Sequence, residues 1–159
     1  MKTFRLDRST LIHRTIDEVF PYFADAGNLE RITPPWLRFR ILTPRPIEMA
    51  EGTLIDYSLG LHGVPIRWKT RIAAWEPPRL FIDEQVKGPY SLWRHTHSFE
   101  ADPAGSEGTL MRDIVDYSLP AGPLSPLINR LYVRRELDRI FDYRAKAIEE
   151  AFHAPHARA

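Results

Sequence analysis

Hydrophobic and polar residues alternate along most of the chain between residues 3 and 119, which is the pattern of strands with one buried face. The alternation predicts seven strands, at residues 3–13, 37–43, 53–61, 66–75, 80–87, 92–100 and 109–119. From the second strand onward, only turns or polar loops separate consecutive strands. We therefore expect hairpin connections and an antiparallel sheet.

A helical spacing of apolar residues interrupts this pattern at two places. After the first strand, Thr15 and Glu18 match a capping box that begins a short helix, and a second short turn follows at 29–32. Near the C-terminus, apolar residues recur at helical spacing from about residue 125 to 152. This long helix is the only predicted element large enough to cover the apolar face of the sheet. The order of elements predicts one α+β domain over residues 1–152, followed by a flexible tail at 153–159.

The sixth predicted strand carries the clearest candidate site. Trp93, His95, His97 and Phe99 occupy alternate positions and therefore share one face. If the polar loop that follows closes a simple hairpin, His97 lies opposite Asp113 on the last strand. Asp113 would then orient the His97 imidazole as an acid or a base, or the two groups would only satisfy each other beneath the helix.

The fifth predicted strand leaves two orientations open. One face carries Phe81, Asp83 and Gln85, and the other carries aliphatic residues. Binary patterning buries the aliphatic face and exposes Asp83 and Gln85. A difference of one residue in the length of the next turn reverses the face, so both orientations stay open on the pattern alone.

Aromatic residues of neighbouring strands are expected on the same face as the histidines. With a four-residue turn at 62–65, Tyr57 and Trp68 share one face, and the simple hairpin places Tyr117 opposite Trp93. Such residues form either a packed core or the walls of a ligand cavity.

Composition narrows the classes of partner. The 159 residues are 43% hydrophobic and 11% aromatic with a formal net charge of +1, which indicates a globular protein and gives no reason to expect a nucleic-acid partner. Without cysteine the chain has no disulfide, thiolate zinc site or cysteine nucleophile.

The charged N-terminal segment and the lack of a ~20-residue apolar run predict a cytoplasmic protein without membrane insertion. No phosphate-binding loop, nucleotide fingerprint or His-Glu-x-x-His motif is present, so we expect no cofactor.

The order of elements and the spacing of residues in the fifth and sixth strands resemble the helix-grip superfamily (SRPBCC), which includes START-like, birch-allergen-like and polyketide cyclase proteins. The resemblance to a bacterial ligand-binding branch is carried by Phe81, Asp83, Gln85, Gly88, Pro89, Tyr90, Trp93, His95, His97 and Phe99. It implies a curved seven-stranded antiparallel sheet wrapped around the C-terminal helix. It also implies that Phe81, Asp83 and Gln85 face a cavity between them, and that a metal is rare in this setting, so we expect none.

Three classes of function are compatible with these features. The first, which we predict, is the binding of a hydrophobic or amphipathic small molecule, such as a lipid, a quinone or a polyketide-like compound. The second is a cyclase, dehydratase or hydrolase that uses His97 and Asp113 as an acid/base pair. The third is a regulatory partner of a larger enzyme, although no protein partner is indicated. The expected ligand-binding residues are Tyr57, Trp68, Phe81, Asp83, Gln85, Trp93, His95, His97, Asp113 and Tyr117.

Overall fold

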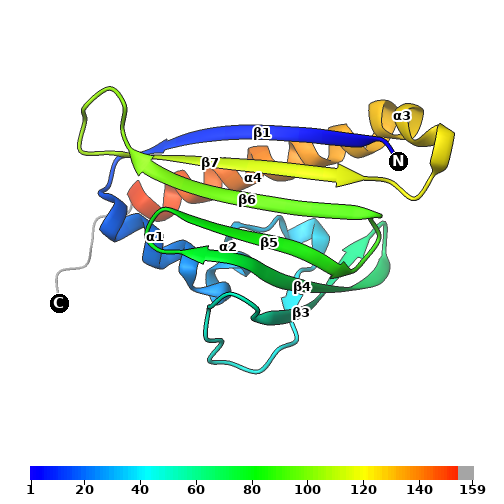
Figure 1. Cartoon of the computed structure of the whole chain (residues 1–159), viewed down its shortest axis with the longest axis horizontal. Helices are drawn as coiled ribbons and strands as arrows, with labels where there is room; N and C mark the ends of the chain where they lie inside the picture. The colour runs from blue at the N-terminus through cyan, green and yellow to red at the C-terminus, as the bar shows by residue number, and fades with distance from the viewer. Residues whose placement is uncertain (154–159) are drawn as a thin grey trace.

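The computed structural model describes residues 1–153 and confirms the helix-grip architecture. A seven-stranded antiparallel sheet has the order β1-β7-β6-β5-β4-β3-β2, and the helices lie on one side of it (Figure 1). The strands are β1 (Thr3–Ile12), β2 (Arg40–Ile41), β3 (Leu54–Leu61), β4 (Val64–Glu76), β5 (Leu80–Lys87), β6 (Leu92–Ala101) and β7 (Thr109–Ser118). The main helices are α1 (Ile16–Ala24), α2 (Leu29–Ile32), α3 (Ser125–Ile128) and α4 (Arg134–His153).

The core lies between the inner face of the sheet and the helices. One part joins α1 and the end of α4 to β5 and β6, through residues such as Phe20, Phe81 and Ile148. A second part joins the first half of α4 to β1 and β7, through Leu137 and Leu6 among others. The predicted one-sided sheet is thus covered by the helix that was expected to cover it.

The outer face of the sheet carries charged pairs. Arg71 and Arg94 both contact the Glu84 carboxylate, and Arg112 pairs with Asp7 across the strands. Exposed pairs of this kind contribute little to stability, about 0–1 kcal/mol each. They mark this face as the solvent side, which leaves the inner face for the core and the site.

The strand expected at 37–43 is much shorter than predicted. Only Arg40–Ile41 pairs with β3, because a turn of 3₁₀ helix occupies Pro35–Leu37. Arg38 then adopts a left-handed conformation with a φ of 46°, which interrupts an extended chain. The alternation of apolar residues over 37–43 therefore did not reflect a continuous strand.

The β3–β4 turn is tighter than the four residues expected. His62 and Gly63 alone form it, both with positive φ, and Leu61 pairs with Val64. Two-residue turns with this backbone match the twist of a hairpin. The register differs from the expected one by two residues, so the side chains keep the predicted faces.

The long C-terminal helix is interrupted near its start. A π-helical turn at Asn129–Val133 separates α3 from α4, and Asn129 accepts a hydrogen bond from the Tyr117 hydroxyl at 2.7 Å. Of the expected tail, only His153 lies within the described residues, where it ends α4. No helix in the described part of the chain is long and apolar enough to cross a membrane.

Candidate functional site

A cavity of about 220 Å³, partly open to the surface, lies between the sheet and the helices. It is larger than the engineered cavity of roughly 150 Å³ that holds benzene, and smaller than the roughly 300–1,000 Å³ of sites for drug-sized ligands. Most of its wall is apolar. The residues that line it from the sheet and from α4 include Ile55, Tyr57, Leu59, Trp68, Thr70, Ile72, Phe81, Asp83, Trp93, His95, His97, Leu137, Ile140, Phe141 and Arg144.

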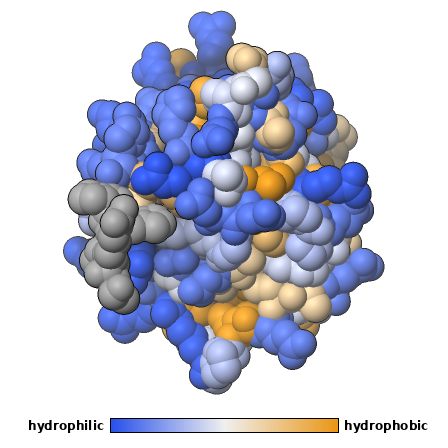
Figure 2. Space-filling model, turned by 90° about the vertical axis from the view of Figure 1, so that its left-hand side faces the viewer, coloured by the Kyte–Doolittle hydropathy of each residue, from blue (hydrophilic) through white to orange (hydrophobic). Residues whose placement is uncertain are grey.

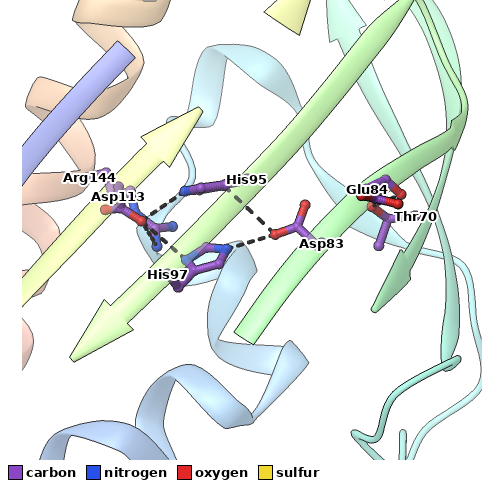
Figure 3. A network of polar contacts seen from close by, with 7 residues as sticks. All are labelled: Thr70, Asp83, Glu84, His95, His97, Asp113 and Arg144. Carbon is purple, nitrogen blue, oxygen red and sulfur yellow. Dashed lines mark hydrogen bonds and ion pairs between the residues drawn. The ribbon is translucent and has the colours of Figure 1, made fainter. Parts of the chain in front are cut away.

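The hairpin of β6 and β7 has the register that the sequence predicts. His97 pairs with Asp113, and Trp93 pairs with Tyr117. In the neighbouring hairpin, Asp83 of β5 pairs directly with His95. Three central strands therefore bring two carboxylates and two imidazoles together on the inner face (Figure 3). Asp83, His95 and His97 form one wall of the cavity, and Asp113 lies behind the histidines.

His97 lies between the two carboxylates. Its Nε2 donates a hydrogen bond to Asp83 Oδ2 at 2.7 Å, and its Nδ1 lies 3.1 Å from Asp113 Oδ1. The second contact is an ion pair whose angle does not meet hydrogen-bond geometry, and Nδ1 is fully buried. Neither ring nitrogen of His97 is therefore free to face the cavity.

His95 has one engaged nitrogen and one free nitrogen. Its Nε2 donates to Asp113 Oδ1 at 2.8 Å, because a carboxylate can only accept. Its Nδ1 makes no hydrogen bond within residues 1–153, and the nearest carboxylate oxygen is Asp83 Oδ2 at 3.8 Å. His95 lines the cavity, so this nitrogen provides a lone pair beside it.

Arg144 of α4 completes the cluster. Its guanidinium lies 3.4 Å from both oxygens of Asp113, and its side chain is buried. A buried ion pair holds its geometry when further hydrogen bonds satisfy both partners. Asp113 meets this condition because it contacts Arg144, His95 and His97 together.

The pKa values of the two histidines are shifted in opposite directions. Burial lowers the pKa of His97, but contacts with Asp113 and Asp83 outweigh it and raise that pKa above its usual value. Burial and the charge of His97 lower the pKa of His95. Burial would raise the pKa of Asp113, yet the charge of Arg144 and the bonds from the imidazoles hold it well below its usual range. Burial likewise acts against ionised Asp83, but its bond from His97 keeps its pKa lowered.

The raised pKa favours the protonated form of His97, and the lowered pKa of His95 favours its neutral form. The lowered pKa values of Asp83 and Asp113 favour the two carboxylates. With His97 protonated, the positive charges of His97 and Arg144 balance the two carboxylates. A neutral buried cluster limits the desolvation penalty that unpaired charges would carry.

Comparison with known families decides the classification. The model for "Polyketide cyclase / dehydrase and lipid transport" matches residues 12–142. The chain belongs to this family. No curated protein matches the chain.

Solved structures show the same fold at low sequence identity. The ZhuI aromatase/cyclase from Streptomyces sp. R1128 is 18% identical, with a TM-score of 0.76 over 99% of this chain and 98% of that one. TTHA0849 from Thermus thermophilus is also 18% identical, with a TM-score of 0.68 over 98% and 100%. A major latex-like protein from Panax ginseng is 14% identical, with a TM-score of 0.63 over 95% and 98%.

The predicted site residues fall into two groups, according to whether they line the cavity. The first group lines the cavity and contains Tyr57, Trp68, Phe81, Asp83, Trp93, His95 and His97. The second group lies outside the cavity wall. Its members are Asp113, which acts through the histidines, Tyr117, which is fully buried, and Gln85.

Gln85 holds the β5–β6 turn instead of facing the cavity. Its Nε2 donates to the Tyr90 carbonyl at 2.7 Å, and its Oε1 accepts from the Tyr90 amide at 3.2 Å. Asp83, two residues earlier on the same face, does reach the cavity. The expectation that both line it is therefore corrected for Gln85.

Sequence reasoning missed Arg144. Arg144 was not among the predicted site residues, yet it is buried against Asp113. A signal was present in the spacing. Arg144 follows Phe141 by three residues and Leu137 by seven, which places it on the buried stripe of α4.

Proposed function

We propose that this protein binds a compact hydrophobic or amphipathic small molecule, of lipid, quinone or polyketide-like chemistry, in the cavity between the sheet and α4. The observation that carries the proposal is the division of the cavity into apolar walls and one charged wall. Apolar walls favour the body of such a ligand by about 25 cal/mol per Å² of buried apolar area. The charged wall fixes its polar end.

Two groups on the polar side are suited to contact a ligand. The free Nδ1 of His95 can accept a hydrogen bond from a ligand. The Asp83 carboxylate can also accept one, in addition to the bond that its Oδ2 already accepts from His97. A ligand hydroxyl, which donates, would match both. The cavity volume of about 220 Å³ favours a body of one or two rings or a short chain.

The direct test is native mass spectrometry of freshly purified protein, together with titration by the fluorescent probe 1-anilinonaphthalene-8-sulfonate. Ile140→Trp should fill the cavity and abolish probe binding, because Ile140 lines it from α4. Leu131→Trp is the matched control, since Leu131 is exposed just before the same helix. Equal probe binding by both variants would contradict the proposal.

An acid/base function has one observation in its favour, and it concerns His95, not His97. Asp113 orients His95 through Nε2, while Nδ1 has a lone pair beside the cavity. This is the arrangement of a general base that is held by a carboxylate. Incubation of an identified ligand with the protein, followed by mass analysis, would show whether it is converted or only bound.

A further inference from the structure

We propose that Asp83, His95 and His97 form a site for a divalent first-row metal ion such as Zn²⁺. Each of the three offers one ligand atom, and these atoms lie within 4.8 Å of one another. The proposal stands on this geometry and does not depend on the ligand-binding function. It departs from the expectation of no metal, which rested on the resemblance to the helix-grip superfamily.

Two of the three separations between the donor atoms are close to the value for one ion. Ligands about 2.1 Å from a tetrahedral metal lie roughly 3.4 Å apart. His97 Nε2 is 2.7 Å from Asp83 Oδ2, and His95 Nδ1 is 3.8 Å from the same oxygen. The two values lie on either side of the expected separation, so small side-chain adjustments suffice. The ion would take the place of the proton in the bond between His97 and Asp83.

The second observation is the arrangement behind the histidines. Histidines that bind a metal nearly always donate their other nitrogen to a carboxylate or carbonyl, which fixes the ring and its tautomer. Here the distal nitrogens of both rings, His95 Nε2 and His97 Nδ1, contact a single oxygen of Asp113, at 2.8 Å and 3.1 Å. Asp113 is held in turn by Arg144 (Figure 3).

Both imidazoles are also fixed by packing. The Phe81 ring stacks on His97 at a centroid distance of 4.1 Å, and Phe141 packs against His95 at 5.7 Å. The rings therefore need little reorganisation to bind an ion. Preorganised ligands with a supporting outer layer are what a metal site requires.

The expected coordination is incomplete on the side of the cavity. Three protein ligands leave at least one position open, as in zinc sites that bind water or substrate. With neutral histidines, Asp83, Asp113 and Arg144 sum to one negative charge, and a divalent ion makes the site positive by one. The open position would thus favour an oxygen anion, such as hydroxide, a carboxylate or an enolate.

The test uses the full chain without an affinity tag, stripped with EDTA and then dialysed against ZnSO₄ or CoCl₂. The wild type should bind one ion per chain and should show visible Co²⁺ absorption bands. Asp83→Asn keeps the shape of the side chain and should lower the affinity by more than the roughly 10- to 100-fold typical of losing an outer-layer partner. His95→Gln should have the same effect. His13→Gln is the matched control, because His13 is exposed on the surface.

The outcomes separate the two proposals. Wild-type protein that binds no more than background Zn²⁺ overturns the metal site, whether or not the variants fold. Loss of binding in His13→Gln but not in Asp83→Asn also overturns it and indicates a surface ion. Probe binding in EDTA reports on the cavity alone, so the ligand-binding proposal can fail or stand independently of the metal.

Discussion

The hydrogen bond between His97 and Asp83 runs diagonally across two strands. Asp83 pairs in register with His95, and His97 pairs with Phe81. Even so, His97 Nε2 contacts Asp83 Oδ2 at 2.7 Å, while His95 Nδ1 is 3.8 Å from that oxygen. Asp83 thus approaches both histidines from the β5 side but bonds only His97, whereas Asp113 contacts both from the β7 side. The two rings lie between the two carboxylates.

Removing Asp113 should destabilise the protein strongly. Asp113→Ala leaves the buried Arg144 without its partner, and breaking a buried pair in this way costs about 3–5 kcal/mol. Asp116→Ala on the same strand removes a partner of the exposed Arg5 and should cost about 1 kcal/mol or less. Urea unfolding measures both. Similar losses from the two variants would show that the buried cluster contributes no special stability.

Acid should lower the free energy of unfolding of the metal-free protein, because Asp113 becomes protonated. The pKa of Asp113 is lowered in the folded state, so its contribution is complete above the unfolded value of about 3.9 and is lost as the pH falls through the folded value. The free energy of unfolding in EDTA should therefore decrease as the pH drops below about 4. Urea titrations at several pH values between 6 and 3 would show the decrease. A stability that rises over this range would contradict the lowered pKa.

Gln85 should affect stability without affecting the cavity. Gln85→Ala removes two hydrogen bonds to the Tyr90 backbone, each worth about 0.5–1.5 kcal/mol. We expect a loss of about 1–2 kcal/mol in unfolding and unchanged affinity for the fluorescent probe. A marked drop in probe affinity would return Gln85 to the ligand site.

Two glycines of the β3–β4 hairpin should respond in opposite directions. Gly63 has a φ of 80° and open space around its Cα, so Gly63→Ala should cost about 1–2 kcal/mol through backbone strain alone. Gly60 has no positive φ, and an added methyl group would make ordinary contacts, so Gly60→Ala should stabilise the strand by about 0.5–1 kcal/mol. Thermal unfolding of both variants checks the sign of each change.

The sequence predicted the strand pairing better than the site. The register of β6 and β7 followed from alternation and a short polar loop, so the pair His97–Asp113 was foreseen. The face of β5 was left open, because a change of one residue in the turn at Lys87–Tyr90 reverses it. The pattern alone therefore did not place Asp83, whereas the resemblance to the helix-grip superfamily implied that it faces the cavity, which it lines.

The predicted and observed structures also differ where the chain enters the edge of the sheet. Alternation over 37–43 predicted a strand, but the 3₁₀ turn at Pro35–Leu37 and the left-handed Arg38 confine strand pairing to Arg40–Ile41. The local pattern of apolar residues did not show where this segment joins the sheet.

The surface in Figure 2 helps to judge the hypothesis of a protein partner. Hydrophilic side chains predominate on this face, and hydrophobic ones form small separate patches. A broad apolar patch, which would favour a protein-binding role, is not seen there.

The order of the strands distributes rigidity unevenly around the cavity. The charged residues that the sheet contributes to the cavity wall belong to β5 and β6 in the interior of the sheet, whereas part of the apolar wall lies at β2, a two-residue strand at the edge. Backbone at a short edge opens more readily than backbone in central strands. For the proposed ligand, we expect strict discrimination among polar ends and tolerance of variation in the hydrocarbon body. Related compounds that share one polar group would then compete for the same chain.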